Sequence, residues 1–300
     1  MSLRRSVALK AAGCPVFAGV LIALAVSCCA GCGGPRLRGG LQAAAPPGPQ
    51  ELRVVTFNVA RDFGLTTGQH TLLSPFVGTP ANLLEDRDLA GAHVVALQEV
   101  CGLGDGAEVN RWLWRLPGVG WHARFVRHDP RRAGACGEGQ LIAVRGSILA
   151  SGVVALPRVR TAGRVATWVE FMRAGVRIRV WNLHLNGRAS TLQPEAARLR
   201  QLTAVLVEIA AFRALRPRAV VVLLGDLNMR SAHEPGLIAL SRSLRSAVTG
   251  GVATHLFGWP LDWIWVAGAE MRRWAVIPIR GSDHFAVAAT LRLSGAFAPR

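Results

Sequence analysis

Tyrosine is absent from the 300-residue chain, and lysine occurs only once, at Lys10. The 35 basic residues are therefore almost all arginine, a bias that is typical of GC-rich coding. Acidic residues are few, 18 in all, so the formal net charge is +17. Because the planar arginine fork donates two hydrogen bonds at once to a phosphate, this excess favours a polyanionic partner without identifying one.

The chain also lacks long runs of like charge, which argues against a charged disordered tail. It has no repeat of solenoid length, so a repeat architecture is excluded. Hydrophobic residues make up 51% and the mean hydropathy is +0.30, which excludes a mainly disordered chain. The length suits one large domain or two small ones.

Residues 1–32 predict an export signal. Three basic residues and no acid precede an uncharged stretch whose apolar centre covers residues 16–26. The sequence Ala-Gly-Cys ending at Cys32 resembles the end of a bacterial lipobox, where a cysteine becomes lipidated, and a weaker candidate ends at Cys28. The alternative is an uncleaved membrane anchor, because the uncharged stretch is almost long enough to span a bilayer. We expect a body that is exported, either secreted or lipid-anchored at the outer face of the bacterial envelope.

Residues 33–50 are dominated by proline and glycine without periodicity and predict a linker, and residues 51–293 read as one domain. Residues 1–32 contain three of the 35 basic residues and none of the 18 acidic residues, so the chain without them has a formal net charge of +14. The only cysteines left are then Cys101 and Cys136. Two thiols in an exported domain suggest a disulfide, and two buried free thiols are the alternative.

Most of the apolar runs that predict strands have polar side chains at one end. Four runs, over residues 53–59, 93–99, 176–184 and 219–226, end at or near such a side chain, and two more, over 261–266 and 282–290, begin near one. The residues delivered in this way are Asn58, Glu99, Asn182, His184, Asp226, Asn228, Asp262, Asp283 and His284. Each alone has an ordinary structural explanation as a cap, turn or solvated end. Burying the whole set is costly unless its members satisfy one another or bind a metal.

Helices are expected between some of these strands. Residues 195–215 carry apolar side chains at helical spacing after Pro194, and shorter candidates cover 82–90 and 108–116. The pattern has too many strands for a helical bundle and too many helices for a plain β-sandwich.

In content and order, the polar series resembles the endonuclease/exonuclease/phosphatase superfamily, whose fold is that of DNase I. The segments that carry the resemblance are Thr-Phe-Asn58-Val, Leu-Gln-Glu99-Val, Asn-Leu-His184-Leu, Gly-Asp226-Leu-Asn228, Leu-Asp262-Trp and Ser-Asp283-His284-Phe. The resemblance implies an α+β fold, a four-layer α/β/β/α sandwich of two packed mixed β-sheets with loops converging at one edge.

The resemblance also implies Mg²⁺-dependent hydrolysis of phosphate esters, with Mn²⁺ or Ca²⁺ as alternative ions. Glu99 and Asp283 would be the metal carboxylates and the Asn58 amide oxygen a further metal ligand, since hard cations take oxygen ligands. In the catalytic set, His284 would be the base, oriented by Asp262.

The remaining catalytic roles also come from the resemblance. Asp226 and Asn228 would orient the water and the phosphate, and His184 would donate a proton or hydrogen bond to the phosphate or leaving group.

The chain departs from the family pattern in two places. The family places a Tyr or Glu between the positions of Glu99 and His184, and the only carboxylate to nominate there is Glu138, which otherwise reads as a polar turn. Ala60 stands where abasic-site repair members carry an acid. Both departures and the export signal argue against a DNA-repair enzyme. Arg158, Arg160 and Arg164 are read as a solvated basic edge, with phosphate binding as the alternative.

The leading hypothesis is therefore an exported, metal-dependent phosphodiesterase that acts on nucleic acid, because a body of charge +14 suits a polyphosphate. The alternatives are a sphingomyelinase-like phospholipase, a phosphatase for phosphoinositides or other small phosphoesters, and a binding module that has lost catalysis. A lipid hydrolase needs an exposed apolar loop, for which Trp112, Trp114 and Trp259 are candidates. We expect a monomer, with a membrane tether through Cys32 or the leader.

Overall fold

The computed structural model describes residues 48–59, 91–102, 116, 119–128, 137–159, 163–187, 192–247, 251–277 and 282–293. Contacts divide the chain into a unit of residues 1–42 and a unit of residues 43–300, and every described residue belongs to the second. The leader, most of the linker, the expected helix over 82–90 and nearly all of that over 108–116 lie outside the described residues. The same holds for Cys136 and for the Cys101 side chain. Among the described helices, none has the length and apolar composition needed to cross a membrane.

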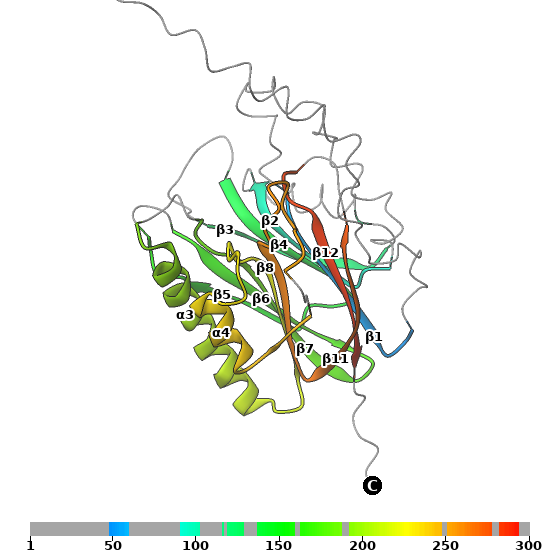
Figure 1. The fold of residues 1–300 in the computed structure, drawn as a ribbon. Helices are drawn as coiled ribbons and strands as arrows, with labels where there is room; N and C mark the ends of the chain where they lie inside the picture. Colours follow the sequence, from blue (N-terminus) through cyan, green and yellow to red (C-terminus); the bar gives the residue numbers. More distant parts are fainter. Residues whose placement is uncertain are drawn as a thin grey trace, which may run out of the picture. The chain divides into compact units, whose positions relative to one another are not determined.

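Twelve strands of the described chain form two six-stranded mixed sheets (Figure 1). The first sheet runs, in spatial order, β11 (Ala269–Ile277), β12 (Ala286–Leu293), β1 (Glu51–Asn58), β2 (Val94–Gly102), β4 (Gly137–Arg145) and β3 (Trp121–Arg127). The second runs β5 (Ala150–Ala155), β6 (Val165–Arg173), β7 (Val176–His184), β8 (Val220–Asp226), β10 (Asp262–Ala267) and β9 (Arg245–Ser246). The expected architecture of two packed mixed β-sheets is confirmed.

The central strands are nearly continuous apolar runs because both of their faces are covered. All seven residues of β8 are buried, as are the last seven of β1. One large core joins the facing sides of the two sheets to the helix side of the second sheet. A second cluster, which includes Val55, Phe57 and Leu97, lies on the other face of the first sheet. These side chains account for most of the favourable free energy of folding.

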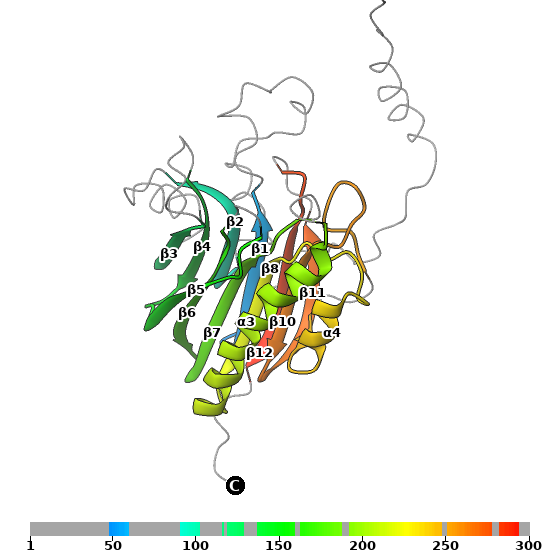
Figure 2. The same ribbon diagram turned by 90° about the vertical axis from the view of Figure 1, so that its left-hand side faces the viewer.

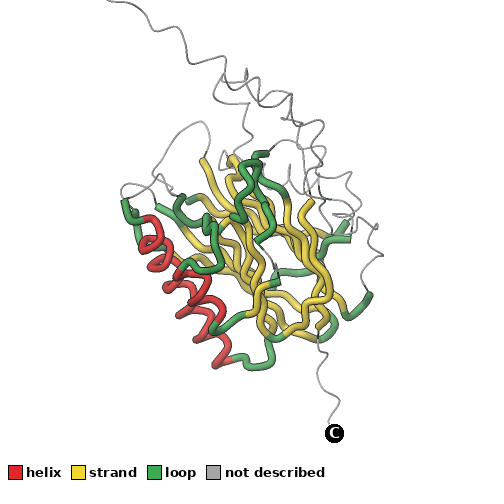
Figure 3. The backbone as a smooth tube through the Cα atoms, viewed as in Figure 1, coloured by secondary structure: helices red, strands yellow, loops and turns green. Residues whose placement is uncertain are grey.

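Helices α3 (Pro194–Leu215) and α4 (Pro235–Ser241) lie on the outer side of the second sheet, as Figures 2 and 3 show from two directions. The apolar stripe expected on α3 is buried there, with Leu202, Val205 and Ile209 in the core. Pro194 stands in the first helical turn, where its missing N–H costs no hydrogen bond. The described helices thus form one of the two expected helical layers.

Two parallel pairs, β1 with β2 and β7 with β8, bring the carboxyl ends of four strands to one edge of the sandwich. Beneath that edge, amide side chains join the two sheets. The Gln98 amide donates to Asn182 Oδ1 at 2.7 Å, and the Asn182 amide donates to the carbonyls of Leu97 and Leu141. Asn182, one of the polar strand ends of the sequence, is therefore a buried cross-link that fixes the sheets beneath the site.

Candidate active site

Strand register places three of the expected site residues side by side. Asp226 ends β8 and pairs in register with His184 of parallel β7 on one side and with Asp262 of antiparallel β10 on the other. His184 Nε2 lies 3.5 Å from Asp226 Oδ2. All three side chains are buried. Three segments far apart in the sequence thus meet at one point because their strands are neighbours.

Asp226 is a carboxyl whose environment opposes ionisation. Burial raises the pKa of Asp226 to about 7, and the nearby Asp262 carboxylate adds to the rise while the charge of His284 opposes it. The Asn228 backbone N–H donates to Asp226 Oδ1 at 2.8 Å, and the Asn58 amide donates to Oδ2 at 3.0 Å. These bonds fix the orientation of the carboxyl group.

His284 and Asp262 form a hydrogen-bonded pair. His284 Nδ1 lies 2.8 Å from Asp262 Oδ2, which also accepts a hydrogen bond from the Thr254 hydroxyl at 2.8 Å. Burial alone lowers the pKa of His284, but the carboxylates of Asp262 and Asp226 outweigh it and raise the pKa to about 10. With Nδ1 facing Asp262, Nε2 faces the site, 3.8 Å from Asp226 Oδ2.

Glu99 interrupts its strand to reach the site. The β2–β4 register shifts between Leu97 and Val100, and Glu99 adopts a left-handed φ of 56°. Such a conformation is uncommon for a residue with a Cβ atom, and bulges of this kind re-aim side chains at functional edges. The Asn58 amide donates to Glu99 Oε1 at 3.3 Å, and His184 Nε2 lies 3.7 Å from the same oxygen.

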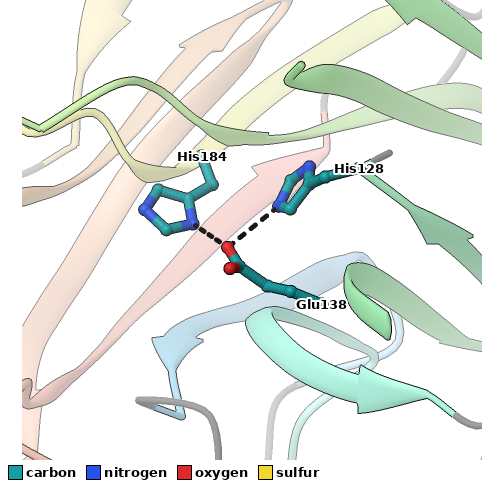
Figure 4. A group of neighbouring side chains, drawn as sticks. All are labelled: His128, Glu138 and His184. Carbon is teal, nitrogen blue, oxygen red and sulfur yellow. Dashed lines mark ion pairs between the residues drawn. The ribbon is translucent and has the colours of Figure 1, made fainter. Parts of the chain in front are cut away.

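Glu138 lies in β4 next to His184, so its interpretation as a polar turn is wrong. Figure 4 shows its carboxylate between the rings of His184 and His128. Glu138 Oε1 lies 3.8 Å from His184 Nδ1 and 3.7 Å from His128 Nε2. Arg164 NH1 donates to Glu138 Oε1 at 2.5 Å and lies 2.9 Å from His184 Nδ1. Glu138 and Arg164 thus form a hydrogen-bonded pair beside His184.

The interpretation of the arginines as a solvated edge fails for Arg164, which is mostly buried against Glu138. Arg158 is exposed, and Arg160 lies outside the described residues. Three side chains, His128, Glu138 and His184, lie close enough to share an ion. The Arg164 guanidinium among them opposes a cation, so this group fits a hydrogen-bonded network better than a metal site.

Asp283 and Asn228 lie at the rim of the cluster. The Asp283 carboxylate is 3.2 Å from His255 Nε2. Burial raises its pKa, but the His255 hydrogen bond and the charge of His284 outweigh this and lower it. Asn228 has a left-handed φ of 53° and donates from its amide to the Leu185 carbonyl at 3.1 Å.

An aromatic group adjoins Asp283 and His284. The ring of His255 stacks on that of Trp259, with centroids 5.3 Å apart. The Arg230 guanidinium also lies over the Trp259 ring, 3.2 Å from its centroid. Phe257 packs beside both rings and is 72% exposed. We call His255, Phe257, Trp259 and Arg230 the aromatic platform.

Sequence reasoning missed His128, His255 and Thr254. His128 follows β3 and His255 lies in a loop, so neither ends a long apolar run. His255 does form a β-bridge with His284, a pairing between distant segments that no local pattern signals.

The site combines three features that phosphoester hydrolysis can use. It has carboxylate oxygens for a hard cation in Glu99 and Asp226, which the Asn58 amide nitrogen bridges, a histidine oriented by a buried carboxylate, and a second histidine beside an arginine. Asp226, Asp262 and His284 also lie close enough to share one ion.

A model of the endonuclease/exonuclease/phosphatase family matches residues 55–284. No curated protein sequence matches the chain. The fold is similar to that of an endonuclease/exonuclease/phosphatase family protein from Bacteroides thetaiotaomicron, with a TM-score of 0.65 and 17% identity over 84% of this chain and 99% of that one.

Two further solved structures show the same fold. A mannosyl-6-phosphatase from Bacteroides thetaiotaomicron has a TM-score of 0.63 and 17% identity over 80% of this chain and 99% of its own. The human Nocturnin catalytic domain with bound sulfate has a TM-score of 0.61 and 18% identity over 81% and 94%. At such identities the likeness shows the fold alone.

Proposed function

The chain belongs to the endonuclease/exonuclease/phosphatase family, a family of phosphoesterases, and from this premise we propose that it is a divalent-metal-dependent phosphodiesterase that acts on nucleic acid. The main support for phosphoester hydrolysis is that Asp226 lies next to His184, Asp262 and His284 at one edge of the sheet. Natural chains seldom bury so many ionisable groups together without a functional reason.

The donor set fits a hard divalent cation such as Mg²⁺. Asp226 and Asp262 are buried carboxyls, and Glu99 adds a third beside Asn58. Burying this much negative charge is costly, and a cation offsets it. Glu99 and Asp226 would hold the ion, together with the Asn58 oxygen once that amide turns its nitrogen away from the two carboxylates. The role expected for Asp283 stays a prediction, since its carboxylate is paired with His255. Once bound, the ion would polarise a phosphoryl oxygen, stabilise the leaving oxygen and lower the pKa of His284.

The chain's own residues would position water and phosphate. Asp262 holds Nδ1 of His284, so Nε2 is the atom that would take a proton from the attacking water. Arg164 occupies the Nδ1 side of His184, which leaves Nε2 to donate toward the phosphate. Asp226 and Asn228 would orient the water and the phosphate, as the family resemblance implies.

The aromatic platform supports nucleic acid as the substrate. Phe257, the exposed ring of the platform, offers a stacking surface for a base beside the site, and such stacking contributes about 1–3 kcal/mol per base. Arg230, stacked on Trp259, adds a cation that faces the same region.

A second candidate, a sphingomyelinase-like phospholipase, is favoured by one observation. Leu256 and Phe257 form an exposed apolar tip next to Asp283 and His284, as a lipid hydrolase needs. A small-phosphoester phosphatase is the third, since a mannosyl-6-phosphatase shares the fold.

The deciding experiment incubates the full chain with Mg²⁺, with or without EDTA, on supercoiled plasmid, single-stranded RNA, sphingomyelin vesicles and a mannose 6-phosphate ester. His184→Ala is the control for contaminating nucleases. We expect EDTA-sensitive cleavage of nucleic acid that this variant loses. Phosphocholine or phosphate release with intact nucleic acid would transfer the function to the second or third candidate, and no release from any substrate would overturn the hydrolase.

Phe257→Ala tests the platform separately. Because Phe257 is exposed, we expect the variant to fold, to raise KM for single-stranded nucleic acid several-fold, and to leave kcat for a small phosphodiester unchanged. Val119→Ala, at an exposed residue of the first sheet's margin, is the matched control. Equal KM values for both variants would remove the platform from substrate binding.

We also propose that the protein is exported and is tethered through Cys32 or retained by its leader. Export is supported by the basic residues at the N-terminus, the apolar run over 16–26 and the lipobox-like segment that ends at Cys32. Fractionation of producing cells, with Cys32→Ser beside the natural chain, tests this. Release of the variant into the medium is expected, and a cytoplasmic natural chain would refute export.

A further inference from the structure

An arginine-lined groove lies at the end of the sandwich opposite the candidate active site. The groove has a volume of ≈ 1060 Å³ and is formed by the β6–β7 turn, the end of α3, the segment after α4 and the β10–β11 turn. Strand β7 starts at this end with Val176 and reaches the active site with His184, so its nine residues separate the two regions by about 25 Å.

Six arginines line this groove, and one of them, Arg177, is paired with Glu170. We call the other five the basal arginines: Arg213, Arg216, Arg218, Arg242 and Arg245. Four of them are exposed and Arg213 is half-buried. Arg213 donates to the Ser243 carbonyl and Arg216 to the Leu215 carbonyl. Within the described ranges, none of the five forms an ion pair with a carboxylate.

The only acid that lines the groove, Glu270, pairs with Arg272 outside it at 3.2 Å. Five like charges around one depression repel one another, and an anionic partner would relieve that repulsion. The groove is therefore built to attract phosphate or another anion.

The same end carries the entry of the chain. Residues 48–51, where the chain enters β1, line a smaller pocket with Arg272, Arg273 and Arg292. Glu270 pairs in register with Arg292 across β11 and β12, which makes this pocket the direct neighbour of the groove. The 47 residues before it include the apolar run over 16–26, joined covalently to this end.

The lining favours a bilayer surface over a nucleic acid. None of the residues that line the groove is aromatic, so it offers no stacking platform for bases. Two aliphatic side chains stand out among the guanidinium groups instead: Leu215 is 74% exposed and Met172 is 46% exposed. Cations interspersed with exposed aliphatic groups suit a headgroup layer with acyl chains beneath it.

We propose that this basal face docks on an anionic phospholipid bilayer and turns the active-site edge away from it, toward solution. The inference does not depend on the substrate. It adds to a leader-derived tether an electrostatic contact that fixes orientation, since stable membrane attachment usually takes two signals.

The test measures binding of the full chain to phosphatidylcholine vesicles with and without phosphatidylglycerol. We compare the natural chain with the double variant Arg218→Glu, Arg242→Glu and with the control Arg124→Glu, Arg200→Glu. The control pair is exposed, lies on β3 and α3 away from the groove, and changes the net charge equally. The leader contributes equally to all three proteins.

The preference for phosphatidylglycerol should fall at least about tenfold in the basal variant and stay near the natural value in the control. An equal loss in both variants would reduce the effect to net charge and overturn the proposal, as would an unchanged preference in the basal variant. Loss of duplex DNA binding without loss of vesicle binding would assign the face to nucleic acid instead. Hydrolysis of a small soluble phosphodiester, unchanged in both variants, checks the fold and separates failure here from failure of the proposed function.

Discussion

At the scale of single residues, the site depends on which partner each side chain meets. His284 is held between Asp262 and Asp226, whereas His184 is held between Arg164 and the carboxylates of Glu99 and Asp226. One histidine therefore faces two acids, and the other has a guanidinium on one nitrogen. Two imidazoles in one site thus have different electrostatic environments, as a base and a donor need.

Replacing His284 with Ala should lower kcat for phosphoester hydrolysis by about 10²–10⁴-fold, because it removes the side chain that would take the proton. His233→Ala, at an exposed loop residue, should change kcat little. Steady-state kinetics on a small phosphodiester, with circular dichroism as the fold control, measures both. Full activity of His284→Ala would remove His284 from the mechanism.

At the scale of the elements, Gly225 positions Asp226. Gly225 has a φ of 137°, and a Cβ atom there would lie 1.9 Å from the Leu183 carbonyl oxygen of the neighbouring strand. Gly146 also has a positive φ, of 116°, but no atom lies within 4 Å of an added Cβ. Substitution of Gly225 therefore adds a steric clash to backbone strain, whereas substitution of Gly146 adds backbone strain alone.

Gly225→Ala should reduce the free energy of unfolding by at least about 3 kcal/mol and abolish activity, since the β7–β8 pairing must shift. Gly146→Ala should cost only about 1 kcal/mol, from strain alone, and leave activity intact. Urea unfolding of the two variants makes the comparison. Equal losses of unfolding free energy in the two variants would show that the close contact at Gly225 does not determine the β7–β8 pairing.

The sequence predicted the elements where the apolar pattern was long. The strand over 176–184 matches β7, and the helix expected over 195–215 begins one residue earlier at Pro194. It did not predict the end of β2, which continues past Glu99 to Gly102 through a bulge, because a register shift arises only when strands pair. The segment over 282–290 was expected to place Asp283 and His284 before a closing strand, and β12 does begin after them, at Ala286. The Ser282 and His284 contacts hold the preceding turn out of the sheet.

The candidate site was predictable to the same degree. Polar residues at the ends of apolar runs reached one edge because parallel strands share their carboxyl ends there. His255, His128 and the buried position of Arg164 were not predictable, because each depends on contacts between segments distant in sequence.

At the scale of the whole molecule, stability is coupled to pH through buried His93. Its Nδ1 accepts the Arg53 backbone N–H at 2.9 Å, so the folded state requires the neutral ring. Burial, together with the charges of Arg173, Arg145 and Arg53, lowers the pKa of His93 to about 4 from an ordinary 6.5. The unfolded chain therefore binds a proton between pH 6.5 and 4 that the folded chain excludes, and stability falls as the pH falls through that window.

The loss assigned to His93 amounts to about 2.5 kcal/mol at pH 4.5 relative to pH 7.5. His93→Asn, whose amide oxygen can accept the same hydrogen bond, should lack this part of the pH dependence, whereas the exposed His233→Asn should retain it. Urea unfolding at the two pH values gives the difference. Parallel pH profiles for His93→Asn and the natural chain would contradict the assignment.

Metal binding should also register in the stability of the whole fold, because the ligands come from different elements. Asn58 ends β1, Glu99 lies in β2, and Asp226 ends β8 of the other sheet. An ion held by all three binds only the folded state, so it stabilises by RT ln(1 + [ion]/Kd), which is about 2.7 kcal/mol at one hundred times Kd. For a body of this size, that corresponds to a rise in Tm of about 5–10 °C.

Thermal unfolding of EDTA-treated protein, with and without Mg²⁺, should show this rise in the natural chain and lose most of it in Glu99→Gln. Glu195→Gln, at the exposed start of α3, should keep it, since that carboxylate lies on the outer helix layer. Because Tm reports on the folded state directly, the measurement separates metal binding from catalysis. A Tm that does not respond to Mg²⁺, Mn²⁺ or Ca²⁺ would leave the carboxylates without the cation that their burial calls for, and the proposed hydrolase would fail with it.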